Sequence, residues 1–191
     1  MKRLSLFIAA GALSVAASAA SANEFQAPLE DLARNQIKII VSDATVVAAI
    51  KAQNGKHGGL SQGDIDGMDQ QWRAEVKNGG GDLINTVLAN ALSDYLKSQK
   101  EAAAGQFTEI FVMDNKGLNV GQSDITSDYW QGDEAKWQKT YGAGAGAIHV
   151  SEVELDESTQ TYQSQVSVPI IDPADGSVIG AATFGVDVSS L

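Results

Sequence analysis

The feature of this sequence that most constrains its fold is a change in hydrophobic periodicity near residue 105. Before this point, apolar residues recur every three or four positions, as in a helix that buries one face. After it, apolar and polar residues alternate, as in a strand with one buried face. One change of this kind predicts an α+β domain, in which helices from the first half pack on a sheet from the second half.

Three stretches with helical spacing are predicted in the first half. The first is one long helix over residues 29–52, which is expected to stop at the Asn54–Gly55 pair. The second carries an apolar stripe over residues 65–76 and has Ser61 as a candidate N-cap. The third carries its stripe over residues 84–95.

Five strands are predicted in the second half. Tight turns such as 114–117 and 172–176 join several of them, which favours an antiparallel sheet. Within the fourth strand, the apolar positions from Val166 to Ile170 face one way, and Gln163 and Gln165 face the other. The strands are expected at residues 108–113, 118–123, 148–155, 161–171 and 177–188.

The first 22 residues have the layout of a secretory signal peptide. Lys2 and Arg3 precede an apolar stretch over residues 4–15, and the small residues 16–22 follow it. The alternative, a membrane anchor, is disfavoured because the apolar stretch is shorter than the ~20 residues needed to cross a bilayer. We therefore predict cleavage near Ala22, export to the periplasm, and a single domain over residues 23–191.

Composition excludes several functions. The chain has 24 acidic residues against 13 basic ones and a formal charge of −11, so it would repel nucleic acid, which is not an expected partner. It contains no cysteine, which excludes disulfides, zinc–cysteine sites and cysteine nucleophiles. No Gly-x-Ser-x-Gly elbow occurs, and the acids at residues 64–69 lack the spacing of a calcium loop. We predict no enzyme, catalytic residue, metal or cofactor.

An insert between the second and third strands concentrates the aromatic residues. Two of the three tryptophans and two of the four tyrosines lie within residues 123–141. Asp133 is expected to cap a short helix that carries Trp137 and Tyr141 on one face.

Together these segments resemble the extracytoplasmic Cache domains, also called PDC domains, which are PAS-like sensor modules. The resemblance implies a PAS-like antiparallel sheet of about five to six strands, a long N-terminal helix and flanking helices. It also implies a pocket for a small metabolite on one face of the sheet, lined by the insert and the central strands. The segments that carry it are EIFVMDNKGLNVGQS, TSDYWQGDEAKWQ, ESTQTYQSQVSVPI and GSVIGAATFGVDVSSL.

Seven residues are candidate ligand contacts. Four are aromatic residues of the insert, whose ring faces attract cations, and the insert carboxylate adds negative charge. The histidine alternates with apolar neighbours in the third strand. The resemblance implies that the last aspartate holds a ligand amine, because it loosely matches the residue that the family's amino-acid binders use. The candidates are Tyr129, Trp130, Asp133, Trp137, Tyr141, His149 and Asp187.

Each candidate also has a structural alternative. The two tryptophans of the insert are equally well explained as packing residues, and Asp187 as a strand-end residue that binds backbone. Both arginines of the mature chain lie in the helical half, so no bidentate carboxylate clamp is visible in the insert. Lys136 or Lys139 would act only as a point charge. The sequence therefore favours an amine-bearing or zwitterionic ligand over a dicarboxylate.

Two functional hypotheses follow. The first is a periplasmic Cache-domain protein that senses a small metabolite or presents it to a membrane partner, such as a sensor kinase, chemoreceptor or transporter. A separate partner is expected because family members usually continue into a membrane helix, whereas this sequence ends at Leu191. The alternative is a structural or regulatory interaction module that binds no ligand. In either case, the long N-terminal helix is a candidate surface for a homodimer.

Overall fold

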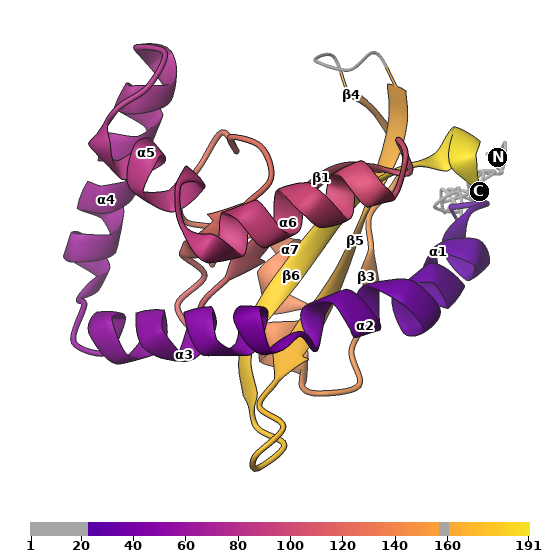
Figure 1. Cartoon of the computed structure of the whole chain (residues 1–191), viewed down its shortest axis with the longest axis horizontal. Helices are drawn as coiled ribbons and strands as arrows, with labels where there is room; N and C mark the ends of the chain where they lie inside the picture. The colour runs from indigo at the N-terminus through magenta and orange to yellow at the C-terminus, as the bar shows by residue number, and fades with distance from the viewer. Residues whose placement is uncertain (1–22, 157–160) are drawn as a thin grey trace, which may run out of the picture.

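A six-stranded antiparallel sheet organises the second half of the chain (Figure 1). The computed structural model describes residues 23–156 and 161–191, so the predicted signal peptide lies outside the described residues. The strand order is β2-β1-β6-β5-β3, and β4 also pairs with β5. The predicted α+β class and antiparallel sheet are confirmed. The strands are β1 (Phe107–Met113), β2 (Asn119–Gln122), β3 (His149–Val150), β4 (Glu154–Asp156), β5 (Thr161–Ile171) and β6 (Val178–Asp187).

The single strand predicted over residues 148–155 is wrong, because the chain forms the two short strands β3 and β4 there. The side chain of Ser151 explains the interruption. The backbone N–H of Gln165 donates to the Ser151 hydroxyl at 2.8 Å, although the Ser151 N–H still donates to the Gln165 carbonyl at 2.9 Å. One main-chain bond of the ladder is thus replaced by a side-chain bond, and regular pairing stops between β3 and β4.

The first helical stretch is broken, so the prediction of one long helix over residues 29–52 is wrong. The chain forms α1 (Gln26–Leu32), a π-helical turn (Ala33–Ile37), α2 (Lys38–Val41) and, after a break, α3 (Ala44–His57). Asp43 causes the break, because it is extended and its carboxylate accepts the backbone N–H of Thr45 at 2.7 Å as an N-cap.

The expected stop at Asn54–Gly55 is also wrong, since α3 continues to His57. The Asn54 side chain bonds the sheet instead of ending its own helix. It donates to the Ile179 carbonyl at 2.8 Å and accepts the backbone N–H of Asn115 at 3.0 Å. Tertiary contacts therefore override the local tendency of this pair to end a helix.

The remaining helices are α4 (Gln62–Lys77), α5 (Asp82–Leu88), α6 (Ala91–Ala102) and the short α7 (Ala135–Gln138) of the insert. The predicted cap of α4 is confirmed, because Ser61 and Asp64 form a reciprocal capping box. The third predicted stripe covers α5 and α6, which are separated at Asn90. The Asn90 side chain accepts the backbone N–H of Ser93 at 2.8 Å and so starts a new helix.

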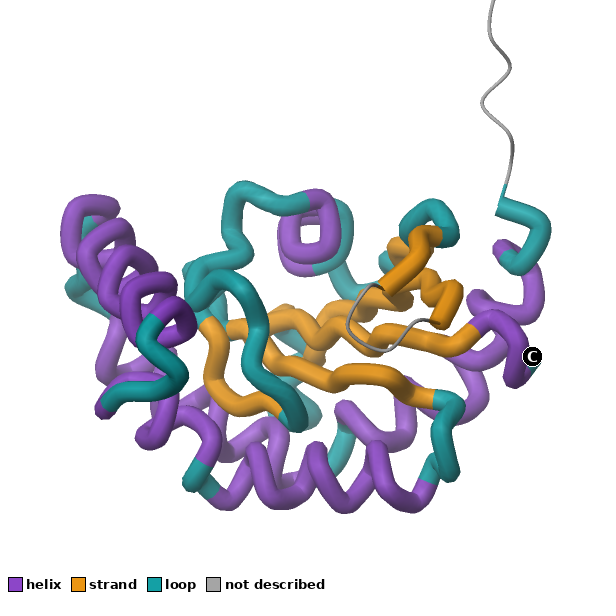
Figure 2. Tube along the Cα trace, turned by 90° about the horizontal axis from the view of Figure 1, so that it is seen from above, coloured by secondary structure: helices purple, strands orange, loops and turns teal. Residues whose placement is uncertain are grey.

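The two faces of the sheet have different coverings. Helices of the first half lie along one face, and the insert with α7 lies over the other (Figure 2). The helix-covered face is apolar and includes Ile110, Val166, Val168, Ile170 and Phe184 in one core cluster. The predicted alternation along β5 is confirmed. Within the described ranges, no helix combines the length and apolar character needed to cross a bilayer.

Candidate ligand-binding cleft

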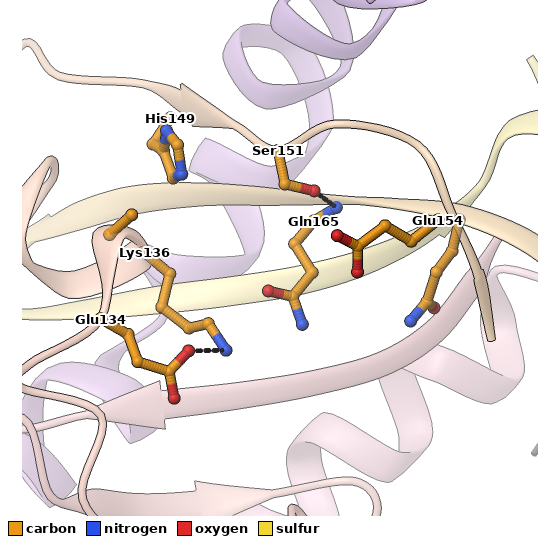
Figure 3. Close-up of a pocket in the computed structure, with 8 residues that line it drawn as sticks. Glu134, Lys136, His149, Ser151, Glu154 and Gln165 are labelled. Carbon is orange, nitrogen blue, oxygen red and sulfur yellow. Dashed lines mark hydrogen bonds and ion pairs between the residues drawn. The ribbon is translucent and has the colours of Figure 1, made fainter. Parts of the chain in front are cut away.

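The face of the sheet beneath the insert carries polar side chains from β5 and charged ones from its neighbours. A cavity of about 310 Å³ lies between α7 and this face (Figure 3). A second cavity of about 490 Å³ shares Lys136, Glu154, Gln163 and Gln165 with it and extends beneath the insert to Glu109. We call the two together the polar cleft. The first cavity is lined by Glu134, Ala135, Lys136, His149, Ser151, Glu154, Gln163 and Gln165.

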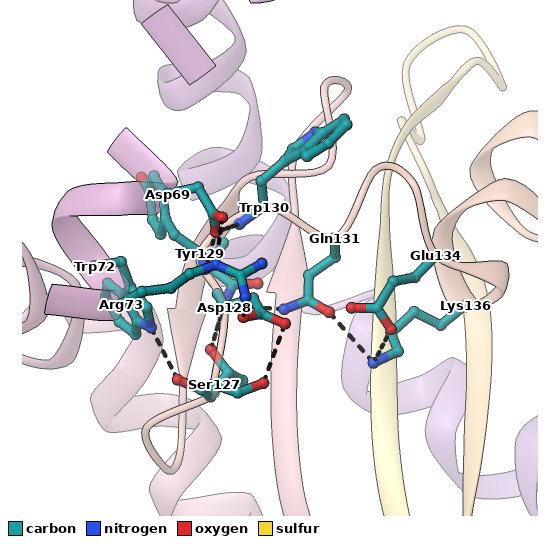
Figure 4. Close-up of polar contacts among 12 residues, drawn as sticks. Asp69, Trp72, Arg73, Ser127, Asp128, Tyr129, Trp130, Gln131, Glu134 and Lys136 are labelled. Atoms are coloured by element: carbon teal, nitrogen blue, oxygen red, sulfur yellow. Dashed lines mark hydrogen bonds and ion pairs between the residues drawn. The ribbon is translucent and has the colours of Figure 1, made fainter. Parts of the chain in front are cut away.

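One wall of the polar cleft carries a positioned cation. The Lys136 Nζ lies 2.8 Å from Glu134 Oε2 and 3.3 Å from Gln131 Oε1 (Figure 4). It also lies 5.4 Å from the centroid of the Phe111 ring. Because these contacts hold a side chain that is only 15% exposed, the ammonium group is fixed on the cleft wall.

The opposite wall carries neutral amides and carboxylates. The Gln165 Nε2 donates to Glu109 Oε1 at 2.9 Å, and the Gln163 Oε1 accepts the Thr108 hydroxyl. Glu154, which pairs with Gln163 in the sheet, is exposed and adds a carboxylate to the lining. The insert side of the cleft therefore carries the Lys136–Glu134 ion pair, and the sheet side carries acceptors.

His149, one of the seven candidate ligand contacts, lines the cleft. Burial, and secondarily the charges of Lys139 and Lys136, lower the pKa of its imidazole. The ring is therefore neutral at neutral pH. It makes no hydrogen bond to any residue that the structure describes, so its nitrogens are available to a ligand.

Tyr129 and Trp130 lie in the join between the insert and α4, and neither lines the polar cleft. The Tyr129 ring is 2% exposed and stacks on Trp72 with centroids 5.4 Å apart, and burial raises the pKa of its hydroxyl. The Trp130 Nε1 donates to the Lys116 carbonyl at 2.8 Å. Their backbone N–H groups donate to Asp69 Oδ1 at 2.9 and 3.0 Å (Figure 4).

An arginine from the helical half does reach the insert, which the sequence did not indicate. The Arg73 Nε lies 2.7 Å from Asp69 Oδ2, and its Nη1 lies 2.7 Å from Asp128 Oδ1. Both carboxylates neutralise this guanidinium. Arg73 thus fastens the insert to α4 and is not free to clamp a ligand carboxylate.

Trp137 and Tyr141 form the base on which α7 rests. Their rings stack with centroids 4.7 Å apart and pack against Phe111, Met113 and Ala181 of the sheet. The Trp137 Nε1 donates to the Asp114 carbonyl at 3.1 Å. The two rings lie outside the cleft lining and fix the helix that carries Lys136.

The two aspartates among the candidates lie elsewhere. Asp133 is exposed and does not cap α7, so that prediction is wrong: Glu134 is the N-cap residue, and its carboxylate pairs with Lys136. Asp187 accepts the backbone N–H and the hydroxyl of Ser189 at 2.9 and 2.7 Å, which caps the helical turn Val188–Ser190. Asp187 therefore has the structural role given as its alternative above, that of a strand-end residue that binds backbone.

Ten other polar residues line the polar cleft and were not among the candidates. Gln163 and Gln165 had a visible signal, because they occupy the face of β5 opposite its apolar residues. No local pattern distinguishes Glu154 or Ser151 from other polar residues of a hairpin. The missed lining residues with polar side chains are Glu134, Lys136, Ser151, Glu154, Gln163 and Gln165 in the first cavity, and Glu109, Thr126, Ser127 and Gln131 in the second.

No family model matches this chain, and no curated protein matches it. Among solved structures, it is similar to the sensor domain of the V. cholerae histidine kinase DctB, with 16% identity, a TM-score of 0.39 and coverage of 87% of this chain and 58% of that one. It is also similar to the ligand-binding domain of the Campylobacter jejuni chemoreceptor Tlp3 in complex with 4-methylisoleucine, with 14% identity, a TM-score of 0.40 and coverage of 85% and 61%.

A third similar structure is the ligand-binding domain of Mlp24 with asparagine, with 14% identity, a TM-score of 0.39 and coverage of 88% of this chain and 62% of that one. The chain therefore spans about three fifths of the length of these three solved domains. All three are described as sensor or ligand-binding domains.

Proposed function

We propose that this chain is an extracytoplasmic Cache-type sensor module that binds a small zwitterionic metabolite in the polar cleft. The observation that carries the proposal is a lysine on the insert wall that has a third N–H donor beyond those accepted by Glu134 and Gln131, and that faces carboxylates on the sheet wall. Lys136 is fixed on α7, and Glu154 and Glu109 lie on the sheet side, with the amides of Gln163 and Gln165 beside them.

A free α-amino acid matches this arrangement. Its carboxylate would accept from Lys136, and its ammonium group would donate to the carboxylates of the sheet side. The neutral imidazole of His149 would take a third polar contact. The cavity volumes of about 310 and 490 Å³ fall within the range of pockets that bind small molecules.

In this proposal, the seven predicted contacts fall into three groups: one touches the ligand, four support the cleft and two do neither. His149 touches the ligand directly. Trp137 and Tyr141 act through α7, because they seat the helix that presents Lys136. Tyr129 and Trp130 hold the insert to α4, and Asp133 and Asp187 make no direct ligand contact.

We also propose that the chain works in the periplasm and transmits occupancy of the cleft to a separate membrane protein, such as a sensor kinase, chemoreceptor or transporter. Support for export comes from the residue pattern of positions 1–22. The N-terminal helical run remains the surface proposed for a homodimer, since Ile39 on α2 is 72% exposed.

A thermal-shift screen of amino acids, amines and dicarboxylates, followed by calorimetry, tests the proposal. We expect zwitterions to stabilise the protein and Lys136→Gln to weaken binding by about tenfold or more, because a charge-assisted hydrogen bond is lost. Lys77→Gln, which removes an exposed lysine of α4, is the matched control and should bind normally. Stabilisation by dicarboxylates alone would contradict the ligand class. A screen without any response would favour the interaction module instead.

A further inference from the structure

A separate cavity lies beside the N-terminal helical run. Its volume is about 500 Å³, and the N-terminal helical run, the segment 145–148 and β5 supply its lining. It shares no lining residue with the polar cleft. We call it the helix-side groove. Its lining residues are Ala33, Arg34, Lys38, Val41, Ser42, Ala145, Gly146, Ala147, Ile148, Val168, Pro169 and Ile171.

The chemistry of the helix-side groove differs from that of the polar cleft. Its lining is apolar except for Arg34, Lys38 and Ser42, and it includes no carboxylate. This is unusual in a chain with 24 acidic and 13 basic residues. The groove therefore combines an apolar floor with a positive rim, which suits a ligand that has an apolar tail and an anionic head.

The two cations of the rim are not equivalent. The Arg34 Nη2 lies 2.7 Å from Glu30 Oε2, and its Nη1 lies 3.6 Å from Asp31 Oδ1, so its charge is already balanced. Lys38, one turn further along, makes no ion pair with any residue in the described ranges. Lys38 is thus the cation that is available to an anionic head group.

The backbone of the helical run is irregular at the groove. Residues Ala33–Ile37 form a π-helical turn between α1 and α2, and Ala33 and Arg34 of this turn line the groove. Such π-turns occur mostly as single insertions within helices and are frequent at functional sites. This observation is independent of the cavity and of its charge.

We propose that the helix-side groove binds the free anion of a medium-chain fatty acid. The alkyl chain would lie on Val41, Ile148 and Val168, and the carboxylate would pair with Lys38. A single carboxylate is favoured over a polyanion because the described rim has one unpaired cation. The small residues 145–147 leave the space that the tail would fill.

Calorimetric titration with hexanoate, heptanoate and octanoate tests this proposal. Because each buried methylene contributes a constant increment, affinity should rise about fourfold with each added carbon. Octanol and octylamine should bind more weakly than octanoate. Lys38→Gln should weaken octanoate binding by about two- to fivefold and leave octanol binding unchanged, since a partly exposed ion pair contributes little. Lys77→Gln is again the matched control.

A second variant tests the location. Ala147→Trp should fill the groove and abolish octanoate binding, while its circular dichroism spectrum and its binding at the polar cleft stay normal. Lys136→Gln should not affect octanoate binding. The two proposals, binding in the polar cleft and binding in the helix-side groove, can therefore be refuted independently of each other. Affinity that is independent of chain length, equal binding of octylamine, or octanoate heats that survive Ala147→Trp would each overturn the proposal. Absence of octanoate binding would overturn the proposal as well, and this includes the case in which the protein is a dimer through this face.

Discussion

The two faces of the sheet are built from the same strands but serve different purposes. On β5, Val166, Val168 and Ile170 enter the apolar core beneath the helices, whereas Gln163 and Gln165 face the polar cleft. Burial of apolar surface contributes stability, while polar groups that line a cavity contribute little to it. The helix-covered face maintains the fold, and the insert-covered face carries the cleft in which we propose that the ligand binds.

The largest expected loss of stability comes from a substitution on the helix-covered face. Phe184 is fully buried and packs edge-on against Phe107, with centroids 5.0 Å apart. Phe184→Ala should lower the free energy of unfolding by about 3–5 kcal/mol, because it removes a buried ring and leaves a cavity. Urea denaturation measures this loss. Gln165→Ala, on the other face, should cost less than about 1.5 kcal/mol; equal losses would remove the distinction between the faces.

The next effect concerns the join between the insert and α4. Asp69 accepts two backbone N–H groups of the insert and pairs with Arg73. Asp69→Ala should lower the free energy of unfolding by about 2–3 kcal/mol, because buried donors lose their acceptor. The matched control is Asp66→Ala on the same helix, whose exposed side chain bonds only Gln62 among the described residues and should cost within about 0.5 kcal/mol.

A smaller effect on stability is expected in the polar cleft. Lys136→Gln should change the free energy of unfolding by about 0–1 kcal/mol, since its ion pair with the partly exposed Glu134 is worth little. The same variant should lose ligand affinity. A large loss of stability would show that Lys136 holds the insert in place and would undermine its assignment to binding.

The smallest effect is a dependence of stability on pH that arises from His149. Burial, and secondarily Lys139 and Lys136, lower the pKa of this imidazole in the folded protein below its ordinary value of 6.5. The unfolded chain therefore binds the proton more readily. Stability should be complete above about pH 6.5 and fall as the pH drops through the folded pKa. The free energy of unfolding of His149→Gln should depend less on pH across this range. An unchanged dependence would show that His149 is not its source.

Much of the fold could be predicted from the sequence because periodicity reports which face of each element is buried. The antiparallel sheet, the alternation along β5 and the cap at Ser61 all follow from patterns within a few residues. The breaks at Asp43 and Asn90 were missed because the apolar spacing continues across them. In each case one side-chain bond to the backbone starts a new helix without disturbing the stripe.

The site was less predictable because its position depends on contacts between distant segments. The aromatic residues directed the prediction to the insert, which forms one wall of the polar cleft, but most of their rings pack against other parts of the protein. Trp130 bonds the β1–β2 turn and Trp137 rests on β1 and β6. Lys136 acquires its place from Glu134, Gln131 and Phe111, and no spacing rule in the sequence brings these together.

The most direct test of the central claim is an NMR titration of the side-chain amides with a mixture of the proteinogenic α-amino acids. Gln163 and Gln165 face the polar cleft, whereas Asn54 and Asn90 bond backbone carbonyls outside it. Binding in the cleft predicts saturable shifts of the two glutamine amides, with the two asparagine amides unmoved. Shifts of the asparagines alone, or no shift of either glutamine at saturating concentration, would contradict the account.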